Sequence, residues 1–207
     1  MTESEKCSYF VPMLPVPDLF PEPLPDGIIY VPEFVDAVTE SNLVLALSQG
    51  QWDYTYKRRR KHFGKEYAAV GGAPKQGVYP GSLPGWLRAI ALKLQKTGYF
   101  SEVPKHSLIN EYLPGQGIAD HTDADDGVTI RVASLSLGSG AEMRFTEPNG
   151  RRHFLYLEPR SLVVFEGAVA TDWHHGIPAR LSDRIGGLII ERARRVSLTF
   201  RENASNY

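Results

Sequence analysis

The segment Asn110-Glu-Tyr-Leu-Pro-Gly-Gln-Gly-Ile-Ala-Asp-His-Thr-Asp123 places a histidine and an aspartate two residues apart, after a strand-like run and a Pro-Gly turn. Residues at i and i+2 of an extended strand project from the same face, so the side chains of His121 and Asp123 can converge on one ion. A second imidazole from a distant strand would complete a 2-His-1-carboxylate metal site with open coordination positions. His175, in Trp173-His-His-Gly-Ile177, is the best candidate. A lone His-x-Asp is common by chance in a chain with six histidines, so this interpretation depends on its context.

Two arginines supply that context. In Arg195-Val-Ser-Leu-Thr-Phe-Arg201 they lie six residues apart within an alternating segment, so both side chains point to one face of a strand. The planar guanidinium grips a carboxylate through two parallel hydrogen bonds. Because a 2-His-1-carboxylate site is typical of non-haem Fe(II) oxygenases, a carboxylate clamp beside it implies a dicarboxylate co-substrate.

Composition and length exclude several classes of protein. The 207 residues, 42% apolar and 23% charged, are those of a globular protein with one domain. The single cysteine, Cys7, excludes an internal disulfide framework and fits a reducing compartment. No apolar run approaches the roughly 20 residues of a membrane span, and the first residues lack a signal-peptide pattern. We therefore expect an intracellular protein of the cytoplasm or nucleus, monomeric and without a membrane association.

The chain divides into a short arm and one domain. Seven prolines lie between residues 11 and 32, and they fix backbone torsions and remove hydrogen-bond donors. We expect residues 1–26 to form a proline-rich arm, extended over the domain or partly ordered, and residues 27–202 to form the domain itself. A proline-motif ligand for a partner protein is an alternative for the arm.

Within the domain, the pattern predicts a strand at 27–31, a helix at 34–47 and an amphipathic helix at 84–97. Either Asp36 or Thr39 is suited to cap the start of the first helix. Further strands are predicted at 107–112, 131–137, 142–145, 152–157, 161–165, 171–176 and 194–201. Pro148-Asn149-Gly150 favours a tight hairpin between two of them. Many short strands with few helices indicate a mainly β fold, a sandwich or jelly roll.

A formal net charge of -1 argues against electrostatic capture of nucleic acid by the whole surface, but the charge is unevenly distributed. The segment Trp52-Asp-Tyr-Thr-Tyr-Lys-Arg-Arg-Arg-Lys-His-Phe-Gly-Lys-Glu-Tyr67 interleaves cations with aromatic rings. Surfaces that bind single-stranded nucleic acid combine these two kinds of side chain, for phosphates and for base stacking. The alternative is a solvated edge strand protected by its charges.

Several motifs together resemble the AlkB family of Fe(II)/2-oxoglutarate dioxygenases. They occur in the family's order, from residue 28 to residue 201: Asn110-Glu-Tyr-Leu-Pro-Gly-Gln-Gly-Ile, His121-x-Asp123, Ser134-Leu-Ser-Leu-Gly-Ser139, Pro159-Arg-Ser-Leu162, His175-Gly-Ile177 and Arg195-x5-Arg201. The resemblance implies a double-stranded β-helix with two supporting helices and an N-terminal nucleotide-recognition lid. It also implies Fe(II), the co-substrate 2-oxoglutarate, and O2.

The resemblance assigns roles to individual residues. Fe(II) would be held by His121, Asp123 and His175, whereas the adjacent His174 would face the other side of its strand. Arg195 would bind the distal carboxylate of 2-oxoglutarate, and Arg201 would lie near its chelating end and help to orient the neighbouring carboxylates. Other expected co-substrate residues are Asn110, Tyr112 and Ser197, the last at a position where bacterial repair members carry asparagine. The expected substrate residues are Asp125, Arg58, Arg59, Arg60, Lys61, His62, Phe63 and Tyr67.

The implied activity is oxidative demethylation or hydroxylation of a nucleobase in single-stranded RNA or DNA, or in tRNA. His121-Thr-Asp-Ala-Asp125 resembles bacterial repair members. In contrast, Arg58-Arg-x-Lys-His-Phe-Gly64 and Asn110-Glu-Tyr-x-Pro-Gly-Gln-Gly-Ile118 resemble the eukaryotic branch that hydroxylates a wobble uridine in tRNA, and relatives of unknown substrate. These two signals favour a nucleic-acid base, with RNA ahead of DNA. Two alternatives stay open: an oxygenase acting on a protein side chain, and a non-catalytic module that binds nucleic acid.

Overall fold

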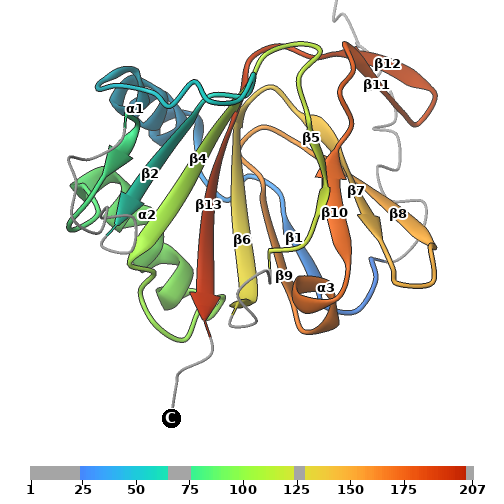
Figure 1. Cartoon of the computed structure of the whole chain (residues 1–207), viewed down its shortest axis with the longest axis horizontal. Coiled ribbons are helices and arrows are strands. Elements are labelled where there is room, and N and C mark those ends of the chain that lie inside the picture. Colours follow the sequence, from blue (N-terminus) through green and yellow to red (C-terminus); the bar gives the residue numbers. More distant parts are fainter. Residues whose placement is uncertain (1–23, 65–75, 124–128, 204–207) are drawn as a thin grey trace, which may run out of the picture.

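The computed structural model describes residues 24–64, 76–123 and 129–203, which form two β-sheets that face each other (Figure 1). The seven-stranded sheet has the order β1-β9-β6-β13-β4-β2-β3 and the four-stranded sheet has the order β5-β10-β7-β8. This arrangement confirms the predicted jelly roll. Residues 1–23 of the predicted arm, and the expected substrate residues Tyr67 and Asp125, lie outside the described residues.

The strand bounds follow the predicted pattern over most of the domain. The strands of the larger sheet are β1 (Ile28–Val31), β9 (Leu162–Glu166), β6 (Thr129–Gly138), β13 (Arg195–Asn203), β4 (His106–Tyr112), β2 (Arg60–Gly64) and β3 (Val78–Tyr79). Those of the smaller sheet are β5 (Ile118–His121), β10 (His174–Ile177), β7 (Ala141–Thr146) and β8 (Arg152–Leu157). The β7–β8 hairpin turns at Pro148-Asn149-Gly150, as predicted.

Three helices accompany the sheets in the described part of the chain: α1 (Ala37–Ser48), α2 (Gly85–Lys96) and the single turn α3 (Ala168–Thr171). The first begins three residues later than predicted, because Phe34 and Val35 are already buried in the core and Asp36 has an extended backbone. Asp36 is the cap residue, and its Oδ1 accepts a hydrogen bond of 2.7 Å from the backbone N–H of Thr39. The second helix is confirmed, with Pro84 directly before it.

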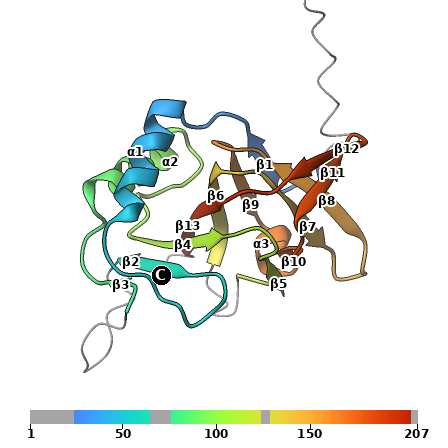
Figure 2. The same cartoon turned by 90° about the horizontal axis from the view of Figure 1, so that it is seen from above.

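The apolar side chains form two layers on either side of the larger sheet. One cluster packs α1 and α2 against one face of β4, β6 and β13, and the other fills the space between the two sheets. Viewed from above, α1 and α2 lie on one side of β4 and β13, and β5 and β10 lie on the other (Figure 2). Alternate residues of β4 and β13 therefore face either the helices or the smaller sheet.

Some predicted elements need correction. The expected strand at 171–176 is the end of α3 followed by β10, since Gly167 starts a helical turn with a φ of 58°. The strand β3 and the hairpin of β11 (Ser182–Ile185) with β12 (Leu188–Glu191) were not predicted. The extended strand expected to carry both His121 and Asp123 ends at His121, so Asp123 lies two residues beyond β5. The basic run enters β2, which pairs with β4 on one side and β3 on the other, so it is not an edge strand. Among the described helices, none is long and apolar enough to cross a membrane.

Candidate metal centre and co-substrate pocket

The structure brings His121, Asp123 and His175 together, although 52 residues separate Asp123 from His175 in the sequence. His121 on β5 is directly opposite His175 on β10, so their imidazoles share one face of the smaller sheet. The Nε2 of His175 is 3.5 Å from Oδ2 of Asp123, and the Nε2 of His121 is 4.0 Å from Oδ1. One potential ligand atom from each residue lies within 4.8 Å of the others, which fits a single ion. His174 is exposed, as strand alternation predicts.

The electrostatic surroundings of His175 and Asp123, and the orientation of the His121 ring, suit metal binding. Burial lowers the pKa of His175 to about 4, so its imidazole is neutral at neutral pH. The Nδ1 of His121 lies 2.9 Å from the carbonyl oxygen of Ala119, and a proton on that nitrogen leaves Nε2 free to bind a cation. Burial raises the pKa of Asp123, but the opposing effects of Arg201 and the two histidines keep it below its ordinary value. Two imidazoles and a carboxylate are the ligand set that Fe(II) takes in oxygenases of this kind.

Glycines allow the two metal-bearing strands to approach each other. A Cβ on Gly176, next to His175, would lie 2.4 Å from Oδ1 of Asp120 and 2.9 Å from the carbonyl oxygen of Ile118. A Cβ on Gly117 would lie 2.2 Å from the carbonyl oxygen of Ile177. Larger residues at either position would push β5 away from β10 and separate the ligands. This explains a glycine in each of the two ligand motifs.

A cavity beside the triad encloses roughly 460 Å³ of non-atom space, part of it open to solvent. Its walls come from both sheets, and they include all three candidate ligands and all five residues expected to bind the co-substrate: Asn110, Tyr112, Arg195, Ser197 and Arg201. Three of them, Arg195, Ser197 and Arg201, lie on β13 and share one face of it, because they are separated by even numbers of residues. Asn110 pairs with Ser197, and Tyr112 pairs with Arg195, across the β4–β13 ladder.

Arg195 has the properties expected of a carboxylate-binding group. Its side chain is 2% exposed, and among the described residues its Nε and Nη1 have no hydrogen-bond partner. Its Nη2 donates a hydrogen bond of 2.8 Å to Oγ of Ser136, and its guanidinium lies 5.2 Å from the ring centre of Tyr112. A buried cation with unused donors favours a bound anion, and the planar fork matches a carboxylate such as that of 2-oxoglutarate. Burial also lowers the pKa of Arg195.

Arg201 holds the metal carboxylate rather than lying free for a ligand. Its Nη2 donates to Oδ1 of Asp123 over 2.5 Å. Oδ2 of Asp123 is then the oxygen nearer His175, which fixes how the carboxylate faces the metal position. This pairing agrees with the expectation that Arg201 helps to orient the neighbouring carboxylates. Sequence reasoning missed Ser136, although it alternates with Ser134 along β6.

The basic run is split between the two faces of the larger sheet. Arg60 and His62 pair with Asn110 and Leu108 of β4, on the cavity side, whereas Arg59, Lys61 and Phe63 face the helices. The expectation that Lys61 and Phe63 contact substrate is therefore corrected. Lys61 is 1% exposed and donates to the carbonyl oxygens of Leu47 and Gln49 at the end of α1. Phe63 is buried and stacks on Tyr79.

The three arginines of the run are engaged within the protein. Arg59 forms an ion pair with Glu111, and Arg60 forms one of 2.6 Å with Asp53. The Nε of Arg58 donates to Oδ1 of Asn110 over 2.9 Å. His62 is half-buried, and burial lowers its pKa to about 4. The run thus presents fewer free charges to a phosphate backbone than its sequence suggests.

A jelly roll with a 2-His-1-carboxylate centre and a buried arginine beside it defines the class of Fe(II)- and 2-oxoglutarate-dependent oxygenases. Residues 39–201 match the family described as the 2OG-Fe(II) oxygenase superfamily. The chain belongs to this superfamily and, within it, to the AlkB family. The enzymes of this class use Fe(II), 2-oxoglutarate and O2, which together oxidise a substrate C–H bond.

Several relatives carry ALKBH names. The mouse protein named tRNA (carboxymethyluridine(34)-5-O)-methyltransferase ALKBH8 is 33% identical over 87% of this chain, which spans 31% of that relative's length. The zebrafish protein named probable RNA/DNA demethylase ALKBH6 is 26% identical over 86% of each chain. The solved structure of OsALKBH1 has a TM-score of 0.66 at 20% identity, over 87% of this chain and 100% of that one, and shows the same fold.

Proposed function

We propose that this chain oxidises a nucleobase in RNA or DNA, using Fe(II), 2-oxoglutarate and O2. One oxygen atom enters the substrate and the other enters succinate, as 2-oxoglutarate loses CO2. On an N-methyl group, the hydroxylated carbon then leaves as formaldehyde; on a ring substituent, the hydroxyl stays. The proposal includes RNA ahead of DNA, and a monomer that acts in the cytoplasm or nucleus.

The observation that carries the oxygenase part is the position of Arg195. Its guanidinium is 2% exposed, and two of its nitrogens have no hydrogen-bond partner within the described part of the chain. It lines the same cavity as His121, Asp123 and His175. The nucleobase part is supported by the relatives' names, which refer to tRNA, RNA and DNA. Because the chain spans 31% of the mouse relative, the methyltransferase activity in that name is not part of the proposal.

Each residue of the site has a defined task under this proposal. Arg195 binds the distal carboxylate of the co-substrate, with Asn110 and Tyr112 as further polar contacts. Arg201 orients Asp123 through their 2.5 Å contact. The apolar wall between the sheets, which includes Met143, excludes water from the oxidised carbon. Asp125 and Tyr67 are retained as proposed contacts to the base.

Mass spectrometry of oligonucleotides tests the proposal directly. Single-stranded RNA and DNA carrying methylated adenine, cytosine or uridine are incubated with the protein, Fe(II), 2-oxoglutarate and O2, and succinate is measured in parallel. We expect one substrate to lose a methyl group or gain an oxygen atom, with equimolar succinate, and Arg195→Ala to abolish both at the same co-substrate concentration. Absence of succinate under all conditions would refute the oxygenase assignment.

A protein substrate is the second candidate, and one observation favours it. Arg59, Arg60 and Lys61 form ion pairs or hydrogen bonds within the protein, which weakens the case for a phosphate-binding strip. Succinate release without any change in the oligonucleotides or in tRNA would support this candidate. Proteomic detection of a hydroxylated or demethylated side chain would then identify the target.

A further inference from the structure

Within the segment Lys57–Lys61, the side chain of Arg58 contacts residues of the co-substrate pocket. Arg58 is half-buried, and its Nε lies 2.9 Å from Oδ1 of Asn110, a residue 52 positions further along the chain. Its guanidinium also lies 5.8 Å from the ring centre of Tyr112. Asn110 and Tyr112 both line the cavity that holds Arg195. Arg58 thus contacts two of the polar side chains that line that cavity.

The contact determines which end of the Asn110 amide faces the cavity. An amide has an oxygen that accepts and an NH2 that donates, whereas the Nε–H of arginine only donates. Since Arg58 occupies the oxygen of Asn110, the NH2 group is the part left for a ligand. A carboxylate ligand needs donors, so this orientation favours its binding, and the reversed amide would repel it.

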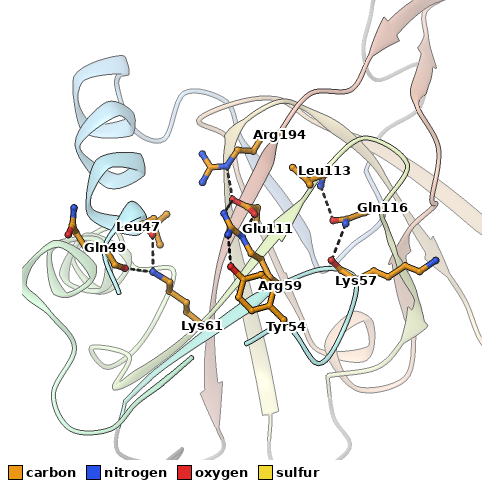
Figure 3. Close-up of polar contacts among 10 residues, drawn as sticks. All are labelled: Leu47, Gln49, Tyr54, Lys57, Arg59, Lys61, Glu111, Leu113, Gln116 and Arg194. Carbon is orange, nitrogen blue, oxygen red and sulfur yellow. Dashed lines mark hydrogen bonds and ion pairs between the residues drawn. The ribbon is translucent and has the colours of Figure 1, made fainter. Parts of the chain in front are cut away.

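Arg58 is held in place by the residues on either side of it. Arg59 and Arg194 both bind the buried carboxylate of Glu111, and the backbone N–H of Glu111 donates to the carbonyl oxygen of Arg59 over 3.0 Å (Figure 3). On the other side, Nε2 of Gln116 donates to the carbonyl oxygen of Lys57 over 3.0 Å. Glu111 is 3% exposed, and its two guanidinium partners hold its pKa below the ordinary value although burial opposes this.

Glu111 therefore ties the segment before β2 to both β4 and the start of β13. Arg194 directly precedes Arg195, and Glu111 directly follows Asn110, so the same carboxylate fixes the backbone next to both co-substrate residues. Because the backbone on both sides of Arg58 is anchored, its side chain loses little conformational entropy when it binds Asn110. Such a contact orients the Asn110 amide effectively.

We infer that Arg58 is a positioning residue for 2-oxoglutarate: it orients the Asn110 amide toward the co-substrate and does not serve as a phosphate ligand. The inference rests on the proposed function, since it requires 2-oxoglutarate to bind in this cavity. It changes the role of one residue of the basic run from substrate binding to co-substrate binding.

Calorimetric titration of 2-oxoglutarate into the Mn(II)-loaded protein tests the inference without turnover. We expect Arg58→Ala to raise the Kd for 2-oxoglutarate about fivefold to tenfold, the effect of one lost hydrogen bond to an oriented group. Asn110→Ala should raise it at least as much, and the double variant should be no weaker than Asn110→Ala, because Arg58 acts through Asn110. Lys57→Ala is the matched control: it removes the neighbouring exposed charge and should leave the Kd unchanged.

A second measurement separates this role from phosphate binding. The affinity for a fluorescein-labelled single-stranded RNA, measured by anisotropy, should stay within about twofold of wild type in Arg58→Ala. Weakened RNA binding with an unchanged Kd for 2-oxoglutarate would overturn the inference, and so would fully additive effects of the two alanine substitutions. If the wild-type protein does not bind 2-oxoglutarate, the proposed function fails as well. If Asn110→Ala weakens binding and Arg58→Ala does not, only the inference fails.

Discussion

Replacing Arg195 with methionine should affect the free protein and the co-substrate complex in opposite directions. In the free protein the guanidinium is 2% exposed, and two of its nitrogens lack partners among the described residues. A buried, incompletely paired cation destabilises the fold, because its lost hydration is not replaced. Methionine keeps much of the volume and removes the charge.

The size of the effect follows from the contacts that Arg195 does make. The desolvation penalty of a buried ion is several kcal/mol. It is offset by the hydrogen bond to Ser136, worth about 1.5–3 kcal/mol for a charged donor, and by the ring of Tyr112, worth ~0.5–2 kcal/mol. We expect the substitution Arg195→Met to raise the free energy of unfolding of the free protein by about 1–3 kcal/mol. This corresponds to roughly 2–10 °C in Tm for a domain of this size. Its affinity for 2-oxoglutarate should fall by about 2–5 kcal/mol, or 30-fold to several thousandfold.

Thermal unfolding with and without 2-oxoglutarate measures both effects in one experiment. Saturating 2-oxoglutarate and Mn(II) should raise the Tm of the wild-type protein. Arg195→Met should have a higher Tm than the wild type without ligand, and its Tm should rise little when the ligand is added. Arg192→Met is the matched control, since Arg192 is 9% exposed but fully paired with Asp183 through two bonds of 2.7 Å, so its loss should destabilise the protein by about 3–5 kcal/mol. A destabilised Arg195→Met that keeps the full response to 2-oxoglutarate would refute the reasoning.

Three further predictions test the metal centre and the support of β2. His121→Ala should abolish succinate release with an unchanged circular dichroism spectrum, because one of the three ligands is lost; unchanged turnover would contradict the ligand assignment. Gly176→Ala should lower Mn(II) affinity at least tenfold in calorimetry, since its Cβ would lie 2.4 Å from Asp120, whereas the control Gly85→Ala, with no atom within 4 Å, should be slightly stabilising. Burial, with a smaller effect from Arg59, lowers the pKa of Lys61 from 10.5 to about 8. Between these two pH values the Lys61 amine is protonated in the unfolded chain but largely neutral in the folded protein, so unfolding takes up a proton. The stability of the wild-type protein in guanidinium denaturation should therefore rise relative to that of Lys61→Met as pH increases through this window. A constant difference would show that folding does not lower the pKa of Lys61.

The sequence by itself determined the parts of this protein that depend on local periodicity. Asp36 before an apolar pattern, and Pro84 before a regular stripe, were enough to place α1 and α2 within a few residues. Two arginines in an alternating segment placed the carboxylate-binding candidates on one face of a strand, because side-chain direction in a strand repeats every two residues. His-x-Asp indicated two metal ligands, although Asp123 lies beyond the end of β5. The motif order supplied the family, which fixed His175 as the third ligand over its neighbour His174.

Only the tertiary structure decided what the basic run does. A sequence of five consecutive cations does not tell which of them face the cavity, because that depends on the register of β2 against β4. The register directs Lys61 to the end of α1, and long-range contacts join Arg59 to Glu111 and Arg58 to Asn110, each across 52 residues. Local pattern specifies the direction of a side chain within its element, but the partner it meets there depends on which distant strand lies alongside.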